Sequence, residues 1–227
     1  MWYNMIMENP EDKIILIDKP ENISSFGVVA RIRAKLRDEY GKKVKVGHTG
    51  TLDPFATGLL ILLSGKMTKK SNEFLKQDKI YEATLKLGET STTGDPEGEI
   101  TPKNSKKIPT LAEINKALKA LTGEIEQTVP IFSAVKIDGE RAYKLARAGR
   151  DFTPPTRKIT IYKIDLLEYK YPTLKIRTSV SSGTYIRTLA EDLGKTLGTG
   201  AYLTALRRTK IGNFDLKDAT KLDDFVL

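Results

Sequence analysis

The stretch from Val46 to Gly58 constrains the fold of this chain more than any other feature of the sequence. Its three glycines, Gly47, Gly50 and Gly58, permit backbone conformations and close approaches that other residues resist. Directly after it comes the apolar run 59–63, which predicts a buried strand. A tight loop anchored on a buried strand is typical of a site that must hold a reactive group still.

The apolar pattern elsewhere predicts strands and helices in mixed order. Apolar runs that are β-branched or alternate with polar residues predict further strands at 13–18, 80–87, 158–171, 173–181 and 203–211. Helical spacing predicts helices at 25–36 (capped by Ser24 or Ser25), 70–75, 111–121, 141–149 and 184–197. Because strands and helices do not alternate strictly, we expect an α+β fold with a mixed, mostly antiparallel central sheet flanked by helices. Residues 1–227 are expected to form a single domain.

The composition limits the chemistry that the chain can perform. It has no cysteine and one histidine, His48, which excludes disulfides, thiolate catalysis and metal sites built from cysteines or from several histidines. The segment Gly194-Lys195-Thr196 ends like a phosphate-binding loop, but Leu189 stands where that motif requires glycine. We therefore expect neither a metal nor a cofactor.

No segment of the sequence has the features of a transmembrane span or of a secretion signal. The longest apolar run, 59–63, is far shorter than the roughly 20 residues that span a bilayer. Residues 1–4 do not begin a basic segment followed by an apolar one, so we expect no secretion signal and a cytoplasmic protein.

The charge distribution favours a polyanionic partner. Lysine and arginine total 38 against 29 acidic residues, a net charge of +9, which fits either a soluble surface or nucleic-acid binding. The basic residues are concentrated between Lys136 and Lys163, where eight of them stand against three acids. This clustering favours nucleic acid.

Asp53 is the strongest catalytic candidate. It precedes Pro54, which favours an extended backbone and directs the carboxylate away from any local helix. The structural alternative is a side chain that only stabilises a turn, and taken alone the local sequence slightly favours that alternative.

Arg187 follows a strand and lies close to a predicted helix start, an unfavourable place for a cation with respect to the helix dipole. A carboxylate partner would explain it, and Asp53 is the attractive choice. The alternatives are that Arg187 faces solvent or pairs with Glu191 or Asp192.

Residues 47–58 closely resemble the H-x-G-x-L-D-P-x-A-x-G signature of the TruB-type tRNA pseudouridine-55 synthases. The resemblance continues in order along most of the chain. It includes 16–20, 24–25, 79–81, 129–136, 183–187 and 206–208. The resemblance implies the pseudouridine synthase fold, with Asp53 as the catalytic aspartate, Tyr81 stacked on the target uracil and Arg187 paired with Asp53.

The same resemblance implies a substrate pocket around these residues. Tyr185 and Leu206 would form its walls, and His48 would contact the RNA around the flipped base. Lys19 would support the site rather than react, as would Pro20. Whether Tyr81 also helps to move a proton is left open.

The chemistry of uridine isomerisation suits this residue set. The reaction breaks the glycosidic bond and joins C5 to C1′ without net redox change, so it requires no cofactor. It needs a carboxylate held ionised by a cation, an aromatic surface worth ~1–3 kcal/mol for stacking, and a base flipped out of its stack. The sequence leaves open whether Asp53 attacks C1′ or the uracil, or takes a sugar proton.

A basic insertion at about 127–156 is expected to grip the T-arm of tRNA through its phosphates. Lys136, Arg141 and Arg147 are the expected contacts, and 149–156 is expected to order on RNA. The chain ends at Leu227, so we expect it to lack the C-terminal RNA-binding domain of many bacterial members. We expect a stand-alone monomer without an obligate protein partner.

Two other functional classes remain open at this point. An RNA-binding or RNA-folding protein without turnover would use the same charges and aromatic residues. A hydrolase with an aspartate nucleophile would need further acids for a magnesium site, which the motifs do not supply.

Overall fold

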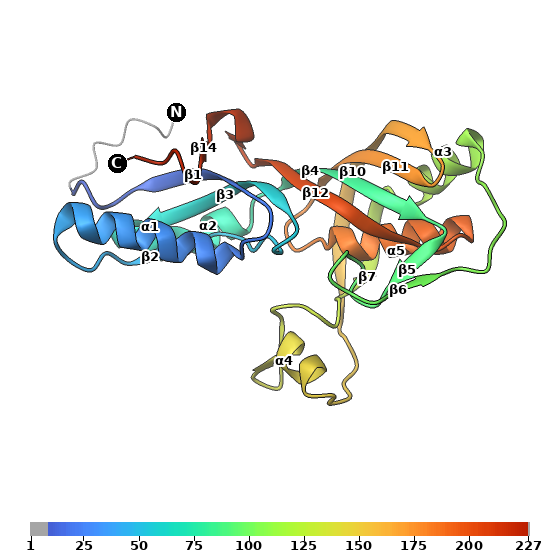
Figure 1. Cartoon of the computed structure of the whole chain (residues 1–227), viewed down its shortest axis with the longest axis horizontal. Helices are drawn as coiled ribbons and strands as arrows, with labels where there is room; N and C mark the ends of the chain where they lie inside the picture. Colours follow the sequence, from blue (N-terminus) through green and yellow to red (C-terminus); the bar gives the residue numbers. More distant parts are fainter. Residues whose placement is uncertain (1–8, 227) are drawn as a thin grey trace. The chain divides into compact units, whose positions relative to one another are not determined.

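The computed structural model describes residues 9–226, which form two compact units (Figure 1). The first unit contains the chain up to Lys79 together with the residues from Arg207 onward, and the second contains Ile80–Leu206. The N-terminal residues on which the expectation of no secretion signal depends lie outside the described residues.

The first unit is built on a sheet with strand order β14-β1-β3-β12. Strand β1 (Ile14–Lys19) is antiparallel to β3 (Thr57–Ser64). Strand β14 (Thr220–Lys221) is parallel to β1. The end of β12 (Ala201–Ile211) is parallel to β3. Two short strands, β2 (Val46–His48) and β13 (Phe214–Asp215), pair with β3 and β12. Strand β3 is buried on both faces, which explains its continuous apolar sequence.

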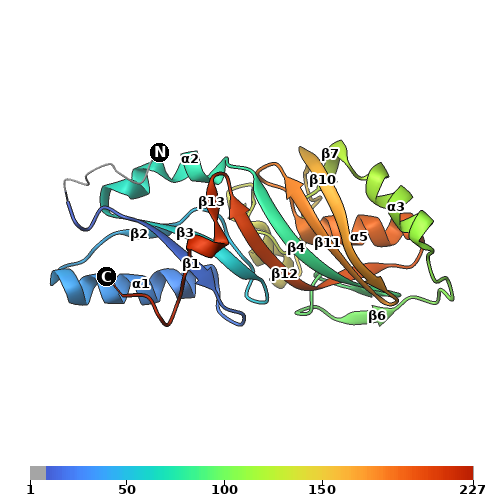
Figure 2. The same cartoon turned by 90° about the horizontal axis from the view of Figure 1, so that it is seen from above.

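Helices cover both faces of this sheet (Figure 2). Helix α1 (Ser25–Tyr40) packs its apolar stripe on the face that contains Leu60 and Leu62. The 3₁₀ helix η1 (Gly65–Lys70) and helix α2 (Ser71–Leu75) cover the face that contains Leu59 and Ile61. The cap of α1 is Ser24, whose hydroxyl accepts a hydrogen bond from the Gly27 N–H at 3.0 Å.

The second unit has the strand order β12-β4-β11-β10-β7. Strand β4 (Lys79–Leu87) alternates buried and half-buried residues, as its sequence predicts. Strands β10 (Thr156–Lys170) and β11 (Thr173–Val180), both predicted, pair with each other antiparallel, and β7 (Gly123–Thr128) is antiparallel to β10. Helix α3 (Leu111–Ala120) packs against α5 (Ile186–Leu197) and against β10.

The predicted α+β class with a mixed, mostly antiparallel sheet is confirmed. The helix predicted at 184–197 begins two residues later, at Ile186. Within residues 9–226, no helix is long and apolar enough to cross a membrane.

Several short elements do not follow from the sequence pattern. The polar segment 88–98, which carries no predicted element, contains β5 (Glu89–Ser91), which pairs with β6 (Ile100–Pro102). The insertion carries β8 (Lys136–Ile137), β9 (Glu140–Arg141) and the predicted basic helix α4 (Ala142–Arg147). A last 3₁₀ turn, η2 (Leu216–Asp218), precedes β14. The short strands among these elements form through backbone pairing of mostly polar residues, which leaves no apolar period to detect.

Candidate functional site

The loop that carries Asp53 is fixed through the backbone of its neighbours. The buried hydroxyl of Ser25 donates to the Leu52 carbonyl and accepts from the Leu52 N–H, both at 2.8 Å. The Asp53 carbonyl accepts from the Ala56 N–H at 3.1 Å. Asp53 itself is half-buried, and these bonds fix the backbone on both sides of it.

Lys19 lies under the same loop. It is fully buried, and its ammonium donates hydrogen bonds to the carbonyls of Pro20 at 2.8 Å and Pro54 at 3.2 Å. The Pro54 carbonyl also accepts the Asn22 N–H at 2.9 Å. These bonds hold the turn that follows Asp53. From there Lys19 can support the site without reacting, as the sequence predicts.

Arg208 binds the backbone of the glycine-containing loop and of the strand that follows it. Its side chain is buried, and it donates to the carbonyls of Leu59 at 2.8 Å and Gly50 at 3.1 Å. Gly58 has a φ of +100°, and a Cβ there would lie 2.3 Å from the Arg208 carbonyl oxygen. The strand pairing of Arg208 with Gly58 therefore requires glycine.

His48 is placed as a neutral imidazole. Burial, and secondarily the positive charge of Arg208, lower the pKa of His48 below its ordinary value of 6.5. Its Nδ1 accepts a hydrogen bond from the Gly50 N–H at 3.4 Å, which assigns the ring proton to Nε2. The ring therefore offers a hydrogen-bond donor at neutral pH and carries no charge.

The remaining predicted residues of the reaction centre lie in the second unit. Tyr81 is on β4 and Leu206 is on the neighbouring strand β12, and each is 7% exposed. Tyr185 immediately precedes α5, two residues before Arg187. The fold of this unit therefore places Tyr81 and Leu206 on neighbouring strands, and Tyr185 and Arg187 at the start of one helix.

Arg187 is buried and hydrogen-bonded to two loops. Its Nη1 lies 3.2 Å from the Asp95 carboxylate and donates to the Thr93 carbonyl at 3.0 Å. Its Nη2 donates to the Phe132 carbonyl in the insertion at 2.8 Å. Such bonds stabilise a charge in a position that the helix dipole disfavours.

Of the alternatives for Arg187, the solvent-facing one is wrong, since the side chain is 6% exposed. Asp192 pairs instead with Lys195, at 3.1 Å. Asp53 belongs to the first unit and Arg187 to the second, so their pairing stays a prediction.

Asp95 is a functional candidate that the sequence pattern missed. It is 2% exposed and accepts hydrogen bonds from the Thr93 hydroxyl at 2.5 Å and the Glu97 N–H at 3.0 Å. Asp95 stands before Pro96 in a glycine-containing loop, the same dipeptide as Asp53 and Pro54. That repeated Asp-Pro pair is the signal that could have identified it.

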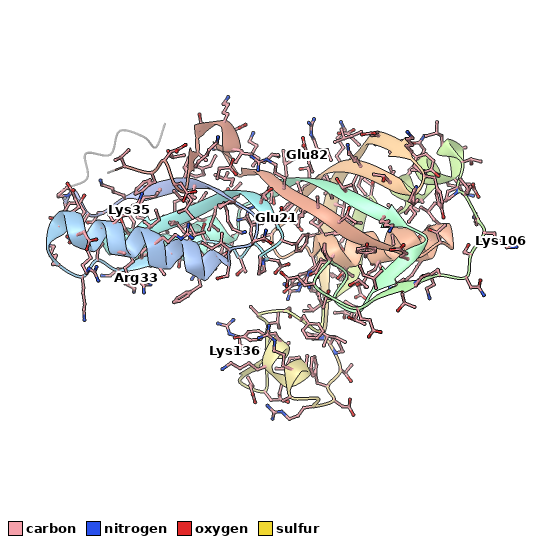
Figure 3. All side chains as sticks on the ribbon, viewed as in Figure 1. Glu21, Arg33, Lys35, Glu82, Lys106 and Lys136 are labelled. Atoms are coloured by element: carbon pink, nitrogen blue, oxygen red, sulfur yellow. The ribbon has the colours of Figure 1, made fainter. Side chains whose placement is uncertain are left out.

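The basic residues of the insertion are exposed. Lys136, Arg141 and Arg147 present their charges to solvent on β8, β9 and α4 (Figure 3 labels Lys136). Arg141 donates to the Ala134 carbonyl, and the Arg147 guanidinium lies 5.8 Å from the centroid of the Tyr143 ring. The insertion therefore carries accessible cations beside an aromatic ring.

Two family models match adjoining parts of the chain. Residues 37–186 match the TruB family pseudouridylate synthase N-terminal domain, and residues 187–227 match the tRNA pseudouridylate synthase B C-terminal domain. Together they contain every candidate residue named above except Lys19, Pro20, Asn22 and Ser25.

The chain is similar over almost its full length to bacterial proteins named tRNA pseudouridine synthase B. The protein from Phocaeicola vulgatus is 44% identical over 96% of this chain and 94% of its own length. That from Parabacteroides distasonis is 44% identical over 94% of this chain and 93% of its own. The protein from Neisseria meningitidis is 45% identical over 97% of this chain and 70% of its own.

Solved structures give the same result for the fold. A Cbf5–Nop10–Gar1 complex contains a chain with a TM-score of 0.72 and 30% identity, over 94% of this chain and 53% of that one. An H/ACA RNP bound to a substrate RNA containing 2′-deoxyuridine gives a TM-score of 0.67 and 26% identity, over 96% of this chain and 58% of that one. With these matches, the chain belongs to the TruB family of pseudouridylate synthases.

Proposed function

We propose that this chain converts uridine to pseudouridine in tRNA, at position 55 of the T-loop. The observation that carries the proposal is the match to relatives named tRNA pseudouridine synthase B over nearly their whole length. In this reaction the N1–C1′ bond breaks, C5 joins C1′, the hydrogen on C5 leaves to solvent as a proton, and N1 takes up a proton in its place.

In the proposed mechanism Asp53 is the reacting carboxylate. The bonds from Ser25 and Lys19 to the residues on either side of it support this role, because they fix the backbone without using the carboxylate. Arg187 keeps Asp53 ionised, and Tyr81 stacks on the uracil after the nucleotide has flipped out.

The proposal also assigns the walls of the uracil pocket and the residues that bind the RNA backbone. Tyr185 and Leu206 wall the uracil, and neutral His48 donates a hydrogen bond to the RNA next to it. The exposed cations of the insertion contact T-arm phosphates. The two units act as one catalytic domain. This domain works as a monomer in the cytoplasm, where tRNA is found, and needs no obligate protein partner.

Tritium release from a T-arm RNA labelled with 5-tritiated uridine tests the assignment of Asp53. The Asp53→Asn variant should release no tritium above background and should bind the RNA with unchanged affinity. Asp38→Asn is the matched control, since Asp38 is an exposed acid on α1 that pairs with its neighbour Arg37 at 2.9 Å. Release at the wild-type rate by Asp53→Asn would overturn the assignment.

The unmutated protein decides between catalysis and binding without turnover. Release of tritium, with pseudouridine mapped to position 55 of tRNA, is the expected result. Tight binding of the T-arm without any release would favour an RNA-binding protein and would reject the proposed reaction.

A further inference from the structure

Gln127 holds the backbone of Tyr185 with both ends of its side chain. Its Nε2 donates to the Tyr185 carbonyl at 3.0 Å, and its Oε1 accepts from the Tyr185 N–H at 2.7 Å. Gln127 is 0% exposed, so its amide cannot reach the RNA. A buried amide that is satisfied by a single residue fixes the position of that residue.

Arg157 holds the ring of the same tyrosine. Its guanidinium lies 5.2 Å from the centroid of the Tyr185 ring, within the range of a cation–π contact. Its Nη1 donates to the Gly183 carbonyl at 3.4 Å. Arg157 therefore connects the ring to the turn that leads into α5.

Gln127 and Arg157 are direct partners in the β7–β10 ladder, which is the stem of the insertion. Residues opposite each other in an antiparallel pair direct their side chains to the same face, so one rung of the ladder reaches both the backbone and the ring of Tyr185. The Val129 N–H donates to the Pro155 carbonyl at 2.9 Å, which continues the pairing of the stem two residues beyond Gln127 and Arg157.

A second bond ties the stem to the same helix end. The Thr188 hydroxyl donates to the Thr128 carbonyl at 3.3 Å, next to Gln127 on β7. The first turn of α5, which carries Arg187, is thus attached to β7 on both sides of Arg187.

We propose that Gln127 and Arg157 are positioning residues that set the orientation of Tyr185 for pseudouridine formation. The inference rests on the proposed function, in which Tyr185 walls the uracil. Neither residue touches the reacting atoms, so each acts on the rate of the chemical step through Tyr185. A phosphate-binding role for Arg157 would instead change the affinity for RNA.

The test measures the single-turnover rate at saturating tRNA separately from the dissociation constant. Arg157→Ala should lower the rate about tenfold and leave the dissociation constant within about threefold of the wild-type value. Lys175→Ala is the control for loss of one cation, because Lys175 lies on β11 and pairs with Glu168 at 2.6 Å. Lys175→Ala should leave both quantities unchanged.

A double-mutant cycle with Tyr185→Ala gives the decisive readout. Once the ring is absent, Arg157→Ala should slow the reaction no further, because its effect passes through that ring. Additive losses of rate in the double variant would overturn the proposal, as would a loss of affinity without a loss of rate.

Gln127→Met tests the backbone contact with a side chain of similar length. It should lower the rate about tenfold at a temperature where the protein remains folded. Thr178→Val is the control for a lost buried hydrogen bond, because the buried Thr178 hydroxyl donates to the Lys163 carbonyl at 3.0 Å. Equal rates for these two variants, at equal loss of thermal stability, would reject a positioning role for Gln127.

The rates of the wild-type protein and of the three variants distinguish a failure of this inference from a failure of the proposed function. An inactive wild-type protein would reject the proposed function. A normal rate for Tyr185→Ala would reject the role of Tyr185 in the pocket and, with it, this inference. A slow Tyr185→Ala beside normal Arg157→Ala and Gln127→Met variants would reject this inference alone.

Discussion

Arg187 lies 3.2 Å from the carboxylate of Asp95, and the two side chains keep only 7% and 3% of their exposure. The pair joins the start of α5 to a loop that lies 92 residues earlier in the chain. A buried cation needs fixed partners, and here a carboxylate and two backbone carbonyls supply them. The arginine is therefore held by its own unit in a single orientation.

Asp95→Asn should slow pseudouridine formation more than it weakens tRNA binding. The amide keeps the shape of the carboxylate and removes the charge that compensates Arg187, which leaves this cation less firmly placed. We expect a loss of about 1.5–3 kcal/mol in the free energy of unfolding, the usual range for hydrogen bonds to charged groups. Chemical denaturation and single-turnover kinetics measure the two effects.

Asp192→Asn is the matched control for Asp95→Asn. It removes an exposed ion pair with Lys195 on the same helix as Arg187, which should change stability by less than about 1 kcal/mol and leave the rate unchanged. Equal behaviour of the two variants would show that the buried pair has no special part in the site.

Ser25→Ala should lower the rate at saturating tRNA. The Leu52 N–H and carbonyl would lose their shared buried partner, at a cost of about 1–3 kcal/mol, and the residue before Asp53 would gain freedom. Ser24→Ala is the control, because it removes the cap of the same helix, typically worth ~1 kcal/mol, without touching the loop. A rate for Ser25→Ala as high as that of Ser24→Ala would contradict a role of Ser25 in holding the loop.

Gly58→Ala should destabilise the protein far more than Gly41→Ala. Both glycines have positive φ, of +100° and +62°, but a Cβ at position 58 would meet backbone atoms of Arg208 whereas one at position 41 meets nothing within 4 Å. We expect a cost of about 1–2 kcal/mol at position 41, from the left-handed backbone alone, and a larger one at position 58. Thermal unfolding compares the two, and similar midpoints would disprove the close approach of β12 to β3.

His48 should titrate below pH 6.5 and weaken the fold as it does so. Since burial lowers the pKa of His48 in the native state, the unfolded state binds more protons between that lowered pKa and 6.5. Stability should therefore fall as the pH drops through this window and should be free of this contribution above it. His48→Gln should remove the effect.

The histidine is the only one in the chain, so a single C2 proton resonance reports its titration by nuclear magnetic resonance. A midpoint at or above pH 6.5 would contradict the neutral imidazole and its proposed role as an uncharged donor to RNA.

The sequence was sufficient to predict the helices and strands whose apolar residues are spaced so that one or both faces are buried. Helix α1, strand β3 and strand β4 each follow their apolar spacing, because one face or both faces must be covered. The fold class follows from the order of these elements, and Asp53 and Arg187 could be named because each stands in an unusual local context.

The supporting contacts could not be predicted in the same way. Asp95, Gln127 and Arg157 act on residues far away in the chain, and a polar side chain gives no periodic sign of its partner. The need for glycine at position 58 depends on the backbone of Arg208, which the local sequence does not contain. Short polar strands such as β5 and β14 depend on a neighbouring strand and not on their own side chains.

The first unit is assembled from segments on both sides of the second in the sequence. Strand β14 and Leu222, which is 3% exposed in the core that packs against α1, are synthesised only after every residue of the second unit. The residues of the unit with Tyr81 and Arg187 are therefore all present while the unit with Asp53 still lacks the end of β12 and β14. The Asp53 loop, with its tight glycine approach to Arg208, is therefore expected to reach its final structure later than the unit that carries Tyr81 and Arg187.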